Sequence, residues 1–261
     1  MGSLRPQSLP PDVVFFDVGG TLLEVSPSVG HVYATACGAR GAAVVPASVQ
    51  RAFDAAWVAL SEQVPRGADR YRIYPGGETE WWERVSSHAF DLCGVPAESR
   101  PPVEELRGVF AQAEAWRVYS EVAEALEVLK GRGCRLGVIS NWDSRLPALL
   151  GSLGLDGYFE SLIYSAGAGS EKPHPAIFAA ALERFEVGPS RAAHVGDRLE
   201  EDYAGAKAAG LRALLLSRGP RDPGLPERMR PWGDPEDLVS DLREAALRLI
   251  GGAGRSEPTF L

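Results

Sequence analysis

The chain has 261 residues, enough for one large or two modest domains with a sizeable core. Hydrophobic residues at 45% and charged residues at 24% are typical of a globular protein, and they exclude collagens and long coiled coils. The 27 basic and 35 acidic side chains give a net charge of −8, which disfavours nucleic acid and anionic membranes as partners. The composition therefore favours chemistry on a small molecule.

The cysteines and the N-terminal segment bear on where the protein works. The 3 cysteines are odd in number and widely spaced, which argues against a disulfide framework and a zinc knuckle. The first residues lack the apolar stretch of a secretion signal, and no window approaches the roughly 18 apolar residues of a membrane span. We therefore expect a cytoplasmic monomer or homodimer with no membrane partner.

The first apolar run covers residues 13–16 and ends at Asp17. Two later runs have the same form: residues 135–139 end at Ser140, and residues 192–195 end at Gly196 and Asp197. Such runs are typical of strands buried on both faces of a parallel sheet. Weaker strands are expected at residues 161–164 and 213–216, and helices at residues 121–130, 175–185, 201–209 and 236–250. This alternation predicts an α/β fold with a doubly wound parallel sheet.

Between residues 25 and 116 the pattern changes, because apolar residues recur at helical spacing and no buried strand is evident. We expect an all-helical cap domain, residues 25–116, inserted into a core domain of residues 1–24 and 117–261. Trp81 and Trp82 are expected to pack this cap rather than hold a substrate. Arg66, Arg70 and Arg72 are expected to form a solvated charge run, with an anion-steering loop as the alternative. Residues 219–235 are expected to form an irregular loop and residues 251–261 a frayed tail.

Polar side chains follow three of the predicted strands. Because ligands gather beyond the carboxyl ends of parallel strands, Asp17, Ser140 and Asp197 should converge. Two carboxylates at one site suit Mg²⁺, which prefers oxygen ligands. Asp202 can orient its neighbour, hold a metal-bound water, or simply favour a helix N-terminus. Lys172 supplies a compact positive charge that would offset a phosphoryl group.

Four motifs in this order resemble those of the haloacid dehalogenase (HAD) superfamily of aspartate-nucleophile hydrolases. The first, residues 15–22, is similar to the family's hydrophobic strand followed by Asp-x-Asp-Gly-Thr. The second, residues 138–141, ends a strand in Ser, and the third, residues 172–175, has Lys before Pro. The fourth, residues 196–202, has Gly-Asp with a second Asp five residues later. The first motif and the paired tryptophans also resemble a subgroup of HAD-like hydrolase domain-containing proteins (REG-2-like).

The resemblance implies a Rossmann-like core, bound Mg²⁺ and hydrolysis of a small phosphorylated metabolite through an aspartyl-phosphate on the first aspartate. Asp17 would be the nucleophile and Lys172 the second catalytic residue. The resemblance assigns phosphate binding to Thr21, Ser140, Asn141 and Lys172, and metal binding to Asp17, Gly19 through its carbonyl, Asp197 and Asp202.

The sequence departs from this family at Gly19, where its phosphatases carry the aspartate that acts as general acid and base. General acid-base assistance is typically worth about 10²- to 10⁴-fold in rate. Turnover of ordinary phosphomonoesters is therefore expected to be slow, and substrates with good leaving groups should suffer least.

The departure leaves other functions to weigh. Dehalogenases of the family also lack the second aspartate, but they lack the fourth-motif carboxylates that this chain keeps as Asp197 and Asp202. Phosphonoacetaldehyde hydrolases draw a Schiff-base lysine from the cap, and residues 25–116 contain no lysine. The main alternative is a protein that keeps the fold to bind a phosphorylated ligand or a protein partner, with catalysis weakened or lost.

Overall fold

The computed structural model describes residues 9–219 and 222–251. Its centre is a six-stranded sheet in which all neighbouring strands are parallel. The predicted α/β fold with a parallel sheet is confirmed. In spatial order the strands are β5 (Ser161–Tyr164), β4 (Arg135–Ser140), β1 (Val13–Phe16), β6 (Ala192–Gly196), β7 (Arg212–Leu216) and β8 (Leu238–Val239).

Strand β1 lies inside the sheet and is apolar on both faces. Val14 and Phe16 point into one hydrophobic cluster, and Val13 and Phe15 into another on the opposite face. All four side chains are buried, as expected for a strand covered by helices on both sides. The strand order reverses at β1, between β4 and β6, and this is where an open α/β sheet forms a ligand crevice.

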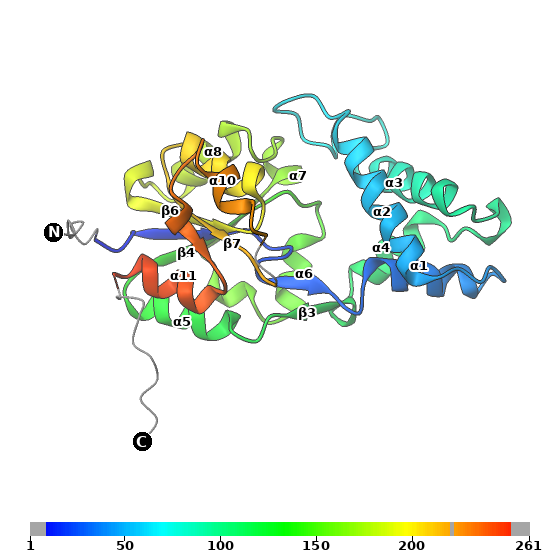
Figure 1. Ribbon diagram of the computed structural model, residues 1–261, viewed down its shortest axis with the longest axis horizontal. Coiled ribbons are helices and arrows are strands. Elements are labelled where there is room, and N and C mark those ends of the chain that lie inside the picture. The colour runs from blue at the N-terminus through cyan, green and yellow to red at the C-terminus, as the bar shows by residue number, and fades with distance from the viewer. Residues whose placement is uncertain (1–8, 220–221, 252–261) are drawn as a thin grey trace, which may run out of the picture.

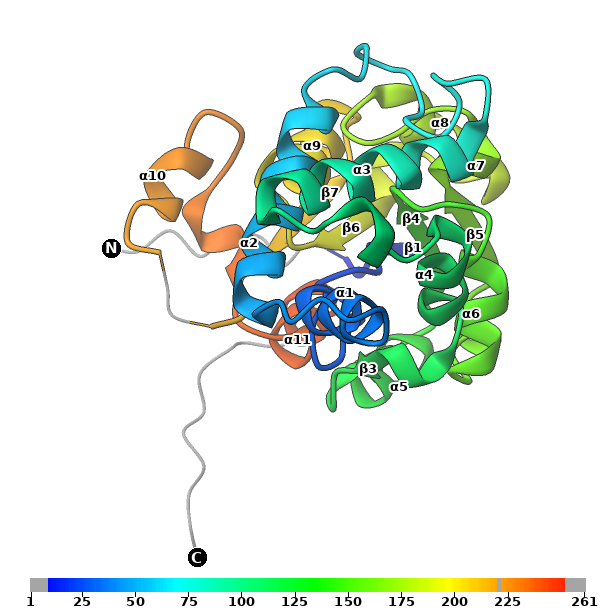
Figure 2. The same cartoon turned by 90° about the vertical axis from the view of Figure 1, so that its right-hand side faces the viewer.

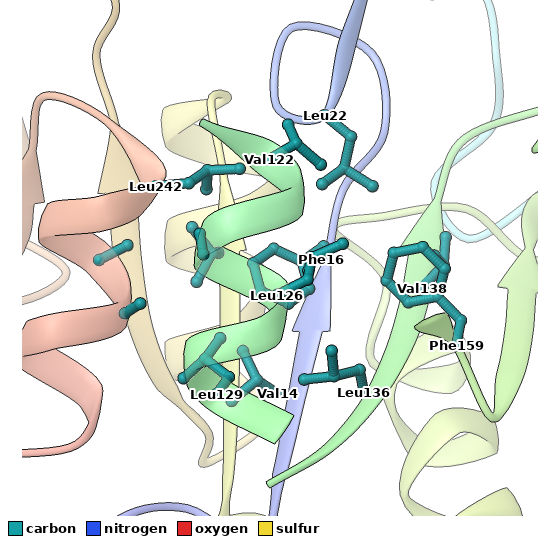
Figure 3. Packing of buried hydrophobic residues seen from close by; sticks show 14 of the residues in the cluster. Val14, Phe16, Leu22, Val122, Leu126, Leu129, Leu136, Val138, Phe159 and Leu242 are labelled. Atoms are coloured by element: carbon teal, nitrogen blue, oxygen red, sulfur yellow. The ribbon is translucent and has the colours of Figure 1, made fainter. Parts of the chain in front are cut away.

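Helices cover both faces of the sheet (Figure 1). On one face, Val122, Leu126 and Leu129 line one side of α5 and point toward β1 and β4 (Figure 3). The predicted helical stripe of α5 is therefore confirmed. The core helices are α5 (Val122–Gly131), α6 (Leu146–Ser152), α7 (Ser165–Ala168), α8 (Pro175–Arg184), α9 (Gly205–Ala208), α10 (Leu225–Met229) and α11 (Leu242–Leu249).

Four helices lie between β2 (Leu23–Val25) and β3 (Trp116–Val118), a pair of short antiparallel strands. They group together on one side of the sheet, and Figure 2 shows them in front of it. Their apolar residues form separate buried clusters. The helices are α1 (Val29–Gly38), α2 (Pro46–Ser61), α3 (Gly77–Cys93) and α4 (Val103–Phe110).

The structure differs from the sequence-based expectation in several elements. The β2–β3 pair was not expected, because runs of three residues are too short to carry a periodic signal. The last helix begins at Leu242 and not near Glu236, because Leu238 and Val239 pair with β7 and Asp241 caps the helix by accepting from the backbone N–H of Glu244.

The expected helix at residues 201–209 is also divided. A π-helical turn (Leu199–Ala204) precedes α9, and such wide turns are frequent at functional sites. The expected loop at 219–235 contains α10, and the expected tail at 251–261 lies, beyond residue 251, outside the described residues. No helix of the described residues combines the length and the apolarity needed to cross a bilayer.

Candidate active site

Asp17 directly follows β1, and two other segments meet its side chain. Its Oδ1 accepts a hydrogen bond of 2.9 Å from the hydroxyl of Ser140, the last residue of β4. The same oxygen accepts a bond of 2.7 Å from Nζ of Lys172. Of the three side chains that the sequence predicted to converge, Asp17 and Ser140 therefore lie in direct contact. Burial raises the pKa of Asp17, and the charge of Lys172 partly opposes that rise.

Lys172 is only 2% exposed and has three hydrogen-bond acceptors. Besides Asp17, its Nζ donates to Oδ1 of Asp202 at 2.5 Å and to the carbonyl of Ile139 at 2.8 Å. Burial alone would lower the pKa of Lys172, but the two carboxylates outweigh it and raise the pKa. The ammonium group is therefore a fixed positive charge. Asn141 anchors its backbone through bonds of 2.9 Å to the Lys172 carbonyl and 2.7 Å from the Lys172 N–H.

Asp202 lies in the π-helical turn and is almost fully buried. Its Oδ1 accepts from Lys172 and lies 2.9 Å from Nε2 of His194, while its Oδ2 accepts from the Arg198 N–H at 2.9 Å. Burial would raise the pKa of Asp202, but Lys172 and His194 overcome it and lower the pKa. Both carboxylate oxygens are thus engaged by N–H donors. This contact with His194 was missed, because a lone histidine inside an apolar strand gives no sequence signal.

Asp197 completes a group of three carboxylates. One oxygen each of Asp17, Asp197 and Asp202 lies within 4.8 Å of the others. Oδ1 of Asp197 is buried and has no hydrogen-bond partner among the described residues. Burial, reinforced by the charges of Asp17 and Asp202, raises the pKa of Asp197 to about 7. A cluster of oxygen donors with an unpaired buried oxygen fits a hard divalent cation such as Mg²⁺.

Gly20 makes the close approach of the Asp197 carboxylate possible. Gly20 has a φ of +78°, and a Cβ added there would lie 2.5 Å from Oδ2 of Asp197. Any larger residue would be strained and would collide with that carboxylate. A Cβ on Gly19 would lie 3.3 Å from Cζ3 of Trp142, so the ring occupies the space beside this position.

A cavity of about 340 Å³ lies between the strand ends and the helices α1–α4. Asp17, Gly19 and Asp197 line its floor, and Tyr33 and Trp82 are among the residues that line it from the helical side. This size is at the lower end of the roughly 300–1,000 Å³ of small-molecule pockets. The arrangement can present a nucleophilic carboxylate and a cation site to a small substrate.

Two candidates lie away from the cavity. Thr21 is fully buried, does not line the cavity, and its hydroxyl has no hydrogen-bond partner among the described residues. His31, a residue that could carry the proton an aspartate at position 19 would supply, is exposed near the start of α1 and does not line the cavity.

The expectation that Arg70 belongs to a solvated charge run is wrong: Arg70 is 3% exposed and its Nε donates to Glu171 at 2.7 Å. Trp82 packs against Trp57 in the helical insertion, as expected, and it also lines the cavity and donates from Nε1 to Asp143 at 2.7 Å. Sequence reasoning missed both hydrogen bonds because each partner is distant in sequence, and Trp142 beside Gly19 was missed for the same reason.

Comparison with known sequences identifies relatives. The family described as haloacid dehalogenase-like hydrolase matches residues 11–210. The haloacid dehalogenase-like hydrolase domain-containing protein 3 of Mus musculus is 37% identical over 205 residues, which are 77% of this chain and 80% of that protein. The rhythmically expressed gene 2 protein of Drosophila melanogaster is 30% identical over 216 residues, with 78% and 82% covered. A phosphoserine phosphatase of Thermus thermophilus is 34% identical over 168 residues, with 63% and 64% covered.

The solved structures that share this fold include proteins named for two different activities, dehalogenase and phosphatase. A dehalogenase with an intermediate complex has a TM-score of 0.65 at 19% identity, covering 91% of this chain and 96% of that one. A HAD phosphatase from Thermococcus onnurineus has a TM-score of 0.61 at 24% identity, covering 92% and 98%. At these identities the likeness establishes the fold alone. The family match and the relative at 37% identity show that this chain belongs to the haloacid dehalogenase-like hydrolases, as its four motifs predicted.

Proposed function

We propose that this hydrolase is a magnesium-dependent phosphatase that cleaves a small phosphorylated metabolite through an aspartyl-phosphate on Asp17. The observation that carries the proposal is the contact of Asp17 with Lys172 and Ser140 beside Asp197, whose buried Oδ1 has no hydrogen-bond partner among the described residues. A nucleophile, a fixed positive charge and a cation site are the parts that phosphoryl transfer needs. The similarity to a phosphoserine phosphatase supports this chemistry over others of the family.

Asp17 would attack phosphorus through Oδ2, because both hydrogen bonds that its carboxylate accepts from Ser140 and Lys172 end on Oδ1. These two bonds fix the plane of the carboxylate before the substrate arrives. The buried ammonium of Lys172 would stabilise the negative charge that the phosphoryl oxygens carry during transfer. Asn141 would act through Lys172, since its side chain holds that residue's backbone at both the N–H and the carbonyl.

The cation site would use carboxylate oxygens and a backbone carbonyl beside the nucleophile. Asp17 and Asp197, together with the Gly19 carbonyl, would hold Mg²⁺. The bound ion would neutralise charge on the transferred group. Asp202 belongs to the same cluster, but its oxygens already accept from Lys172, His194 and the Arg198 N–H. We therefore propose that Asp202 mainly positions Lys172.

Hydrolysis of p-nitrophenyl phosphate tests the proposal, because its leaving group needs little protonation. Product release is expected with Mg²⁺, and its loss is expected with chelator and in Asp17→Asn. Asp12→Asn is the matched control: Asp12 precedes β1, pairs with Arg191 and has a side chain that is 47% exposed. Turnover in Asp17→Asn equal to that of the unchanged protein would contradict the proposal.

Because Gly19 cannot act as a general acid or base, a second function is also a candidate: the protein would bind a phosphorylated ligand without hydrolysing it. No turnover above Asp17→Asn, together with Asp17-independent binding of inorganic phosphate, would support this candidate. A dehalogenase would instead release chloride from a 2-chloroacid in the presence of chelator, and the retained carboxylates Asp197 and Asp202 argue against that activity.

A further inference from the structure

Aromatic rings line the cavity in one unbroken arc. Each ring contacts the next, with centroids 5.2 to 6.2 Å apart. Every member also lines the cavity. In order, the arc consists of Trp82, Trp57, Phe53, Tyr33, Phe110, Trp116 and Trp142. A wall of this kind favours a flat apolar ligand, because each side-chain ring offers its face or its edge to an aromatic ring of the ligand.

The arc ends beside the nucleophile. A Cβ added to Gly19 would lie 3.3 Å from Cζ3 of Trp142. Gly19 and Asp17 line the same cavity as this ring. A phosphate monoester at Asp17 would therefore lie in the cavity that Trp142 also lines. At this position the chain presents a ring in place of a proton-donating carboxyl group.

The charges around the cavity disfavour a second anionic group on the substrate. Three of the four arginines of the lining are closely paired with carboxylates, and the fourth, Arg198, lies 3.9 Å from Asp197. Arg70 pairs with Glu171 at 2.7 Å, Arg107 with Glu78 at 3.0 Å, and Arg145 donates to Asp143 at 2.9 Å. Two carboxylates also line the cavity, Asp54 and Glu201. An additional phosphate or carboxylate would meet negative charge there, with little unpaired positive charge to offset it.

We infer that the preferred substrate is a small aryl phosphate monoester whose aromatic group is otherwise uncharged. This inference rests on the proposed phosphatase function and adds the class of the leaving group. A phenolate leaves without a proton donor far more readily than an alkoxide. A phenol ionises near pKa 10, like tyrosine, whereas an alcohol resembles water at roughly 15.7.

The reaction balances without a protein acid. Oδ2 of Asp17 forms a bond to phosphorus while the bond from phosphorus to the aryl oxygen breaks, and its electron pair leaves with the phenolate. The phenolate then takes a proton from water. A second water attacks phosphorus and cleaves the aspartyl-phosphate, which restores the Asp17 carboxylate and releases hydrogen phosphate and a proton, and that proton neutralises the hydroxide formed in the previous step.

Three substrates separate this inference from the proposed function. Phenyl phosphate and cyclohexyl phosphate have rings of equal size but differ in aromaticity and in leaving group, and acetyl phosphate has a good leaving group and no ring. With Mg²⁺, kcat/KM for phenyl phosphate is expected to exceed that for cyclohexyl phosphate at least 100-fold, the lower end of what general acid catalysis supplies.

Variants of the arc test the ring contact itself, using 2-naphthyl phosphate. The ratio of its kcat/KM to that of acetyl phosphate is expected to fall about threefold to tenfold in Phe53→Leu, the range that one aromatic contact is worth. Phe110→Leu is the second variant if Phe53→Leu folds poorly. Trp232→Leu is the control, because Trp232 is 51% exposed and outside the cavity. The product 2-naphthol should also inhibit competitively, and more weakly in Phe53→Leu.

The outcomes are distinguishable. Turnover of acetyl phosphate with no preference for phenyl over cyclohexyl phosphate would overturn the inference and leave the proposed function standing. Equal ratios in Phe53→Leu, Phe110→Leu and Trp232→Leu would also overturn it. No turnover of any substrate above Asp17→Asn would overturn both.

Discussion

Position 19 carries a glycine where phosphatases that the chain resembles carry an aspartate, and Trp142 occupies the adjacent space. Only a slight shift of that ring would admit a Cβ, because the clash is with the far edge of a side chain that is partly exposed. Gly19 does not have a positive φ, so the backbone itself does not demand a glycine. Neither the backbone conformation nor the neighbouring ring therefore requires that position 19 be a glycine.

Gly19→Asp is expected to raise kcat/KM for cyclohexyl phosphate, by up to about 10²-fold, since the new carboxyl group can protonate an alkoxide. Phenyl phosphate should gain much less. Gly19→Ala is the matched control, because it adds the same Cβ against Trp142 without the acid. Steady-state kinetics with both substrates measure the effect, and an equal gain in the two variants would contradict the account.

Tyr33 is a second residue whose surroundings predict a measurable property. Its hydroxyl lies 2.9 Å from that of Ser86 in a buried contact, and burial raises its pKa to about 12. The unfolded chain releases this proton near pH 10, so the stability that the neutral phenol contributes is complete below pH 10 and is lost as the pH rises through 12. The loss is about 2.7 kcal/mol over two pH units.

Tyr33→Phe removes this titration. At pH 8 the variant should be less stable by about 1 kcal/mol, because it loses the hydrogen bond to Ser86. At pH 11 the difference should shrink or reverse. Urea unfolding at the two pH values measures it, and the same difference at both would show that Tyr33 does not titrate in this way.

At the scale of elements, the loop between α2 and α3 is joined to the loop that carries Lys172. Arg70 in the first loop donates through Nε and Nη2 to both carboxylate oxygens of Glu171 in the second, at 2.7 and 3.1 Å. The guanidinium also lies over Trp57, 4.7 Å from the ring centroid. A buried ion pair is costly to break on one side, because the remaining charge is left without a partner.

Glu171→Gln is expected to destabilise the fold by about 3 kcal/mol, since Arg70 stays charged and buried. Glu160→Gln is the control: Glu160 pairs with Arg135 at the surface, where a pair is worth less than about 1 kcal/mol. Urea unfolding measures both, and hydrogen exchange of residues 62–76 should rise only in Glu171→Gln. Equal effects of the two substitutions would mean that the buried pair does not hold the loops together.

At the scale of the whole molecule, the chain brings together residues that are far apart in sequence. Asp17 and Lys172, 155 positions apart, meet because the loop after β5 and α7 brings Lys172 to the carboxyl ends of β1 and β4, where it also donates to the Ile139 carbonyl. The helices α1–α4 cover that edge, as Figure 2 shows, and complete the cavity. The aromatic arc joins both parts, since Phe110 of α4 contacts Trp116 of β3, which contacts Trp142 after β4.

Much of this arrangement was predictable from the sequence. The runs at β1, β4 and β6 are apolar on both faces, and only a sheet covered by helices buries both. Polar residues at their ends then predicted where Asp17, Ser140 and Asp197 would meet. The local sequence pattern was sufficient to predict these strands, because the spacing of their apolar residues is what causes the strands to be buried.

The sequence alone thus determined the family, five of the six strands of the parallel sheet and the residues at the strand ends. Only the tertiary structure decided how the four inserted helices lie on that sheet, and so which rings line the cavity and which charges are paired. Arg70, Trp82 and Trp142 look like ordinary charged or aromatic residues in the sequence. Their roles depend on partners in other elements, and such contacts arise from packing between surfaces that no local periodicity encodes.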